Sequence, residues 1–75
     1  MPPTVETMTH GQLKLHFAAR CRYHHCDGIR ALGLAHRISV EDLRTHLSEY
    51  EAARNIGDWK EAEDALLRIM KKINS

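Results

Sequence analysis

Apolar residues recur with alternating spacings of three and four along two segments in the second half of the chain. The first segment carries them at Val40, Leu43, Leu47, Tyr50 and Ala53. The second carries them at Trp59, Ala62, Leu66, Ile69 and Ile73, and is widened by Ala65 and Met70. Such spacings align the apolar residues along one face of a helix. We therefore expect two amphipathic helices, with Tyr50 and Trp59 in the core. The alternative for Trp59 is an exposed aromatic that anchors an interface.

Both expected helices follow residues that cap helix N-termini. Ser39 precedes the first, and Asp58, with Glu61 three positions later, precedes the second. Side-chain oxygens at this position accept hydrogen bonds from backbone N–H groups of the first turn. The link at 55–57 is short, and short links make neighbouring helices antiparallel. The sequence thus predicts an antiparallel α-hairpin at the C-terminal end.

The first half of the chain begins with a similar signal but then loses its helical phase. Thr9 and Gln12 form a capping-box pattern. One helical face then carries Leu13, Phe17 and Cys21. The apolar residues that follow drift away from this face, after a run of poor helix formers. We expect a break near 25–28, and one long bent helix over 10–32 is the alternative.

A break at this point would start a short helix at Gly28, with Asp27 as its N-cap and Gly33 at its end. Residues 1–8 contain two prolines and no periodic pattern, so we expect a flexible tail there. The predicted fold class is all-α, a small helical bundle of three to four helices. It forms a single domain over 9–75.

The length of 75 residues limits the chain to one domain with a thin core. A homodimer would cover the apolar surface that such a core leaves exposed. No apolar run reaches the length of a membrane span, and the N-terminus lacks the pattern of a signal peptide. Two cysteines are too few for a disulfide scaffold. We expect a cytoplasmic protein without membrane contact.

The net charge of +1 hides an uneven distribution. Residues 10–37 hold five basic residues against one aspartate, which gives +4, and five of the six histidines. Residues 38–75 hold eight acidic and six basic residues, which gives −2. A basic segment of this kind docks on an anionic surface. The other interpretation is a solvated helix face, partly neutralised by the acidic half of the same chain or of a dimer mate.

From this distribution we expect the Arg/His-rich first half to bind another protein that has an acidic surface. The candidate contacts are Arg20, Arg22, His24, His25 and Arg30. No phosphate-binding loop, metalloprotease motif or nucleophile elbow is present, so we expect no catalysis. The protein would be a non-enzymatic, stoichiometric regulator, inhibitor or adaptor. The alternative is a nucleic-acid-binding transcriptional regulator that uses the basic segment 10–37.

A helix-turn-helix centred on Gly33 finds little support in the flanking residues. The motif needs a small residue before the glycine and an apolar one after it, where this chain has Ile29 and Ser39. Its recognition helix would begin with Glu41 and Asp42, and carboxylates repel DNA phosphates. Any binding to nucleic acid would therefore depend on the basic segment as a whole.

Cys21, His25 and Cys26 are the candidate metal ligands. A zinc-stabilised module built on them is the second alternative. Their spacing, however, has no second ligand pair downstream, as structural zinc patterns do. We therefore expect no cofactor, and we expect Cys21 to be a core residue.

Residues 57–62, with the sequence Gly-Asp-Trp-Lys-Glu-Ala, resemble the turn into the second helix of a tetratricopeptide-type repeat. The first-helix signature is absent, since Glu49 and Tyr50 occupy its positions. No second copy follows at the period of that repeat. The resemblance implies an α-hairpin packed through Ala62 and Ala65, and no repeat family.

Overall fold

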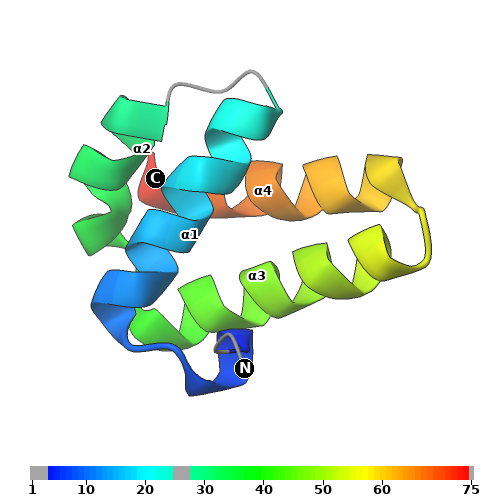
Figure 1. The fold of residues 1–75 in the computed structure, drawn as a ribbon. Helices are drawn as coiled ribbons and strands as arrows, with labels where there is room; N and C mark the ends of the chain where they lie inside the picture. Colours follow the sequence, from blue (N-terminus) through cyan, green and yellow to red (C-terminus); the bar gives the residue numbers. More distant parts are fainter. Residues whose placement is uncertain (1–3, 25–27, 75) are drawn as a thin grey trace.

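Four α-helices and two short 3-10 turns make up the computed structural model, which describes residues 4–24 and 28–74 (Figure 1). The helices are α1 (His10–Tyr23), α2 (Gly28–Leu34), α3 (Val40–Asn55) and α4 (Trp59–Ile73). The 3-10 turns are η1 (Val5–Thr7) and η2 (Ala35–Arg37). The described ranges contain no strand. The predicted all-α fold class is confirmed.

The helices begin where the sequence predicts. The Thr9 hydroxyl accepts a hydrogen bond from the Gln12 N–H at 3.2 Å, and the Thr9 N–H donates to the Gln12 side chain at 2.9 Å. Ser39 and Asp58 each accept a backbone N–H from the third residue of their helices, both at 3.1 Å. Each cap satisfies an N–H group that has no partner within its helix.

The C-terminal hairpin is confirmed, since α3 and α4 run side by side in opposite directions (Figure 1). Gly57 provides the turn between them with a φ of 77°, a left-handed conformation that glycine adopts without strain. The apolar stripes of the two helices face each other and are buried. They contribute Leu43, Leu47, Tyr50, Ala53, Ala62, Ala65, Leu66, Ile69 and Ile73. The alanines among them allow the two helices to approach closely.

Trp59 departs from this pattern, because 47% of its surface is exposed. The sequence placed it in the core, and that prediction is wrong. Trp59 is the first residue of α4, directly after the turn, so its indole lies at the end of the hairpin rather than along its middle. Tyr50, predicted to be buried with it, is fully enclosed.

The predicted break in the first half is confirmed, because α1 ends at Tyr23 and α2 begins at Gly28. The proposed cap, Asp27, lies outside the described residues. The predicted end at Gly33 is wrong, because α2 continues through it to Leu34 and leads into η2. Gly33 keeps a helical conformation, so it does not terminate the helix as a left-handed glycine would.

Small residues explain why the apolar pattern drifts at this point. The short helix α2 packs against the rest of the bundle through Gly28 and Ala31, both buried. Its larger apolar residues, Ile29 and Leu32, remain 84% and 40% exposed. The stripe read from large side chains therefore missed the face on which α2 packs.

The N-terminal segment is part of the packed structure from η1 onward, although we expected the domain to begin at residue 9. Val5 is 5% exposed and belongs to the hydrophobic core. The Arg44 guanidinium donates to the Met8 carbonyl at 2.7 Å, and the Ser48 hydroxyl donates to Glu6 at 3.3 Å. The one apolar residue at position 5 could not form a periodic signal, so the pattern gave no sign of this packing.

Candidate interaction surface

Tyr23, His24 and Trp59 form an aromatic patch where the end of α1 meets the start of α4. The Tyr23 and Trp59 ring centroids lie 6.5 Å apart, and those of His24 and Trp59 lie 6.4 Å apart. Tyr23 packs edge-on against His24, with a centroid distance of 5.1 Å. Because these separations lie in the range of favourable aromatic pairs, the three rings support one another.

The buried Tyr50 anchors this patch to the core. Its hydroxyl is 3.0 Å from Nε2 of His24, and the two rings meet edge to face. Burial raises the pKa of Tyr50, so its hydroxyl keeps its proton at neutral pH. The contact fixes the His24 ring, and the other two rings of the patch rest against it.

The aromatic patch is open to solvent on its outer side. Tyr23 is 65% exposed, and Ile56, in the turn just before Trp59, is 80% exposed. Tyr23 was not singled out from the sequence, although a signal existed. On a helical wheel it falls well away from Leu13, Phe17 and Cys21, the buried stripe of α1. Its exposure could therefore have been predicted from the same pattern.

The predicted partner-binding residues do not form one cluster. Arg20 and His24 lie one turn apart at the end of α1 and both contact α3. Arg20 pairs with Glu51, and His24 contacts Tyr50. Arg22 lies on another side of α1, where its side chain runs beside the start of α2. Arg30 is exposed on α2, and His25 lies outside the described residues. The structure thus places Arg20 and Arg22 on different sides of α1 and Arg30 on α2.

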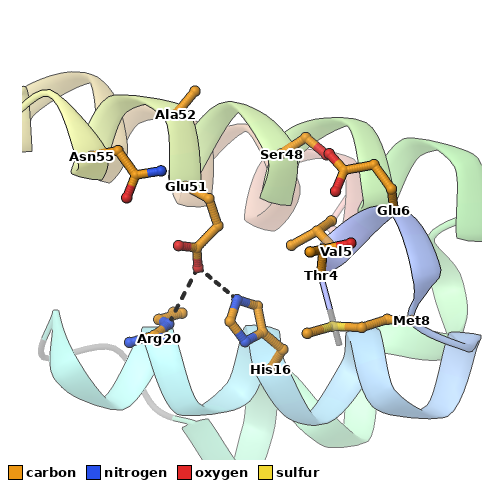
Figure 2. Close-up of a pocket in the computed structure, with 10 residues that line it drawn as sticks. All are labelled: Thr4, Val5, Glu6, Met8, His16, Arg20, Ser48, Glu51, Ala52 and Asn55. Atoms are coloured by element: carbon orange, nitrogen blue, oxygen red, sulfur yellow. Dashed lines mark hydrogen bonds and ion pairs between the residues drawn. The ribbon is translucent and has the colours of Figure 1, made fainter. Parts of the chain in front are cut away.

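Glu51 connects the basic first half of the chain to the acidic second half. Its Oε1 lies 2.8 Å from Nε2 of His16 and 3.7 Å from Nε of Arg20 (Figure 2). Its Oε2 lies 3.7 Å from the Arg54 guanidinium. Part of the basic segment is therefore neutralised within the chain, as the second of our two charge interpretations anticipated. The pairing of residues 35 positions apart gave no local signal in the sequence.

An open groove of about 600 Å³ lies beside these residues, between η1, α1 and α3 (Figure 2). Val5, Met8 and Ala52 supply apolar lining. Glu6 lines the groove as well. The pKa of its carboxyl is lowered by hydrogen bonds from its own backbone N–H and from the side chains of Thr4 and Ser48, and by the charge of Arg44. This carboxylate therefore stays ionised at neutral pH.

Of the three residues proposed as metal ligands, Cys21 alone lies in the described part of the chain. Cys21 is fully buried among core residues, as expected. His25 and Cys26 lie outside the described residues, so the zinc hypothesis stays a prediction. Across 4–24 and 28–74, no group of three or more His, Cys, Asp or Glu residues could hold a metal ion.

Surface ion pairs give the fold an expected sensitivity to acid. The Lys72 ammonium lies 3.2 Å from Asp42, and its hydrogen bond lowers the pKa of this carboxyl below the ordinary value of 3.8. His46 and Arg68 likewise lower the pKa of Glu49 below 4.5. A carboxyl with a lowered pKa in the folded state stabilises the fold above its unfolded-state pKa. The fold loses this stabilisation as the pH falls through the pKa that the carboxyl has in the folded state.

We therefore expect the free energy of unfolding to fall as the pH decreases from above 4.5 to below 3.8. Urea denaturation at a series of pH values measures this change. In Asp42→Asn the dependence should become shallower, because one of the linked carboxyls is removed. Glu63→Gln, at an exposed position of α4, should leave it unchanged. An identical dependence in Asp42→Asn and the unmodified protein would contradict the role given to this pair.

No helix over residues 4–24 and 28–74 is both long enough and apolar enough to cross a membrane. Comparison of the chain with protein-family models, with curated proteins and with solved structures finds no match.

Proposed function

We propose that this protein is a non-enzymatic interaction module that docks on another protein through the aromatic patch and the arginines near it. The observation that carries the proposal is the exposure of Tyr23 and Trp59, at 65% and 47%, on rings that pack against His24. Trp, Tyr and Arg dominate the energetics of protein interfaces. A rigid aromatic surface also loses little conformational entropy on binding.

Charge favours a partner with an acidic surface. Arg20 and Arg22 lie in the last turns of α1, where Arg20 pairs with Glu51 and Arg22 is exposed on another side of the helix. The flanking residues of the first half are mostly basic. Arginines at the rim of an interface accelerate encounter with an acidic partner and select against basic ones. The module would act stoichiometrically, as a regulator, inhibitor or adaptor.

Affinity purification from the native host, followed by mass spectrometry, identifies the partner, and titration with the purified partner tests the surface. Trp59→Ala should weaken binding at least about tenfold, because it removes a hot-spot side chain. The control is Leu67→Ala on the same helix, at a residue of similar exposure, 52%. It should bind as the unmodified protein does. Circular dichroism confirms that each variant is folded.

The basic residues are tested separately, with Arg20, Arg22 and Arg30 all replaced by alanine. This variant should bind the same partner more weakly, and more so at low salt, where charges are least screened. If both it and Trp59→Ala bound as tightly as the unmodified protein, the proposal would fail. Light scattering of the purified protein checks the related case, in which the patch pairs with a second copy in a homodimer.

The second candidate is a nucleic-acid-binding regulator, favoured by the exposure of Arg22, Arg30 and Arg37 on α1, α2 and η2. Such binding would weaken steeply as salt rises, because phosphate contacts release counterions. A gel shift with random DNA at low and high salt distinguishes the two functions. Loss of binding in the arginine variant, with Trp59→Ala unaffected, would favour nucleic acid.

A further inference from the structure

The outer side of α2 leaves large apolar side chains in contact with water. Ile29 is 84% exposed, the highest value among the large apolar residues of the described ranges, and Leu32 is 40% exposed. Leu32 follows Ile29 by three positions and Gly33 follows it by four, so the three residues share one side of the helix. A Cβ on Gly33 would meet no atom within 4 Å, so the space above this residue is open. We call these three residues the α2 face.

The charge around the α2 face is positive. Neither α2 nor η2 contains an acidic residue, and Arg30 and Arg37 are exposed on them. The side chain of Arg22 reaches the start of α2, because its Cγ would collide with a Cβ on Gly28. Within the described ranges, Arg22 and Arg37 take part in no ion pair. These two cations are therefore available to an anionic partner.

The nearest acidic residues along the chain lie outside this surface. Asp27 precedes α2 and is not among the described residues, and Glu41 lies in the first turn of α3. The end of α4, which lies beside α2 in Figure 1, adds no acidic residue after Asp64. Residues 28–37 thus combine exposed apolar side chains with positive charge only.

This combination decides between kinds of partner. The phosphates of a nucleic acid would pair with the arginines but would leave Ile29 and Leu32 in contact with water. A second copy of the chain docked through the same face would bring like charges together. A protein helix whose apolar stripe is bordered by carboxylates would cover the apolar side chains and pair with the arginines at once.

We propose that the α2 face binds an acidic amphipathic helix of another protein. An apolar side chain of that helix would lie over Gly33, beside Ile29 and Leu32, where the missing Cβ lets the partner approach closely. Carboxylates at the edges of its apolar stripe would pair with Arg22 and Arg37. This is a second surface, built on α2 and η2, and it does not depend on the docking function proposed for the aromatic patch.

A synthetic peptide of about 18 residues, long enough to form a helix in water, is the probe. It carries leucines at alternating spacings of three and four, glutamates at the flanking positions, and alanines elsewhere. One control peptide has lysine in place of the glutamates, and another has alanine in place of the leucines. In amide NMR of the unmodified protein, the probe should shift the signals of Ile29, Leu32 and Gly33. Each control peptide should bind at least about tenfold more weakly, because charge attraction or apolar burial is lost.

Variants of the protein locate the binding. Ile29→Ala should weaken binding of the probe about tenfold, because it removes apolar contact area. Its matched control is Ile56→Ala, at a residue 80% exposed in the turn between α3 and α4, which should bind the probe normally. Arg22→Gln combined with Arg37→Gln should weaken binding about tenfold at low salt and less at high salt, where charges are screened. Lys60→Gln, an exposed cation on α4, is the control for charge. Circular dichroism confirms that each variant is folded.

Two outcomes of the peptide titrations would overturn the proposal. One is the absence of shifts on α2 with the probe in large excess. The other is equal binding of the lysine peptide or of the peptide without leucines, since either charge or apolar contact would then play no part. Shifts confined to α2, with losses in Ile29→Ala and in the arginine variant, support it.

Two further titrations separate this surface from the other proposals. If a random DNA duplex displaced the probe, and Ile29→Ala left the binding of DNA unchanged, the arginines would form a nucleic-acid surface and the α2 proposal would fail. Trp59→Ala should bind the probe as the unmodified protein does. Loss of binding in this variant would assign the peptide to the aromatic patch, which would overturn the α2 site and support the docking function proposed above.

Discussion

Replacing Phe17 with alanine is expected to lower the free energy of unfolding by about 3–5 kcal/mol. Phe17 lies in the middle of α1 and is fully buried. Its removal leaves a cavity in a core that is thin and built mainly from aliphatic residues. A chain of this length has a total stability of about 4–11 kcal/mol, so the variant would lose a large share of it. We expect much of it to be unfolded at physiological temperature.

Urea denaturation followed by circular dichroism measures this loss. Leu15→Ala is the matched control, since Leu15 is on the same helix two positions earlier and is 61% exposed. We expect its free energy of unfolding to change by no more than about 0.5 kcal/mol. Equal losses in the two variants would mean that the buried face of α1 has been assigned incorrectly.

Gly28→Ala is expected to destabilise the protein by about 1–3 kcal/mol. A Cβ at this position would lie 2.7 Å from the Ala18 carbonyl oxygen and would also collide with the Arg22 side chain. The arginine can move aside, but the carbonyl belongs to the backbone of α1. The start of α2 would therefore have to shift away from α1, which would disturb the packing of Ala31 beside it.

Gly33→Ala provides the opposite expectation within the same helix. A Cβ on Gly33 would meet no atom within 4 Å, and the residue keeps a helical conformation. Alanine should thus stabilise the fold by roughly 0.5–1 kcal/mol, through its higher helix propensity. The two variants are compared by thermal unfolding. If both variants raised the melting temperature, the close approach of Gly28 to the backbone of α1 would be contradicted.

The hairpin was predictable because its information is local. The caps at Ser39 and Asp58 act within one turn, and the stripes of α3 and α4 repeat often enough to define a face. The beginning of α2 was predictable for the same reason. The end of α2 was not predictable, because a glycine is common both inside a short helix and at a left-handed C-cap. Only tertiary packing decides which of these two conformations Gly33 adopts.

The surface features were harder to predict from the sequence. Trp59 continues the stripe of α4, yet whether the first turn of a helix is covered depends on what lies beyond it. The link from Glu51 to His16 and Arg20 joins positions more than 30 residues apart, so no spacing rule could indicate it. The groove also needs η1, whose packing depends on the burial of Val5. Charge asymmetry along the chain was compatible with internal pairing and with docking, and could not distinguish between them.

The position of Trp59 has a spectroscopic consequence. It is the sole tryptophan in the chain, and it lies half exposed within the aromatic patch. The emission of an indole depends on the polarity around it, and two other rings of the patch lie within 6.5 Å. Fluorescence excited selectively at tryptophan therefore reports from this surface alone. Coverage of the patch can therefore be followed without a label.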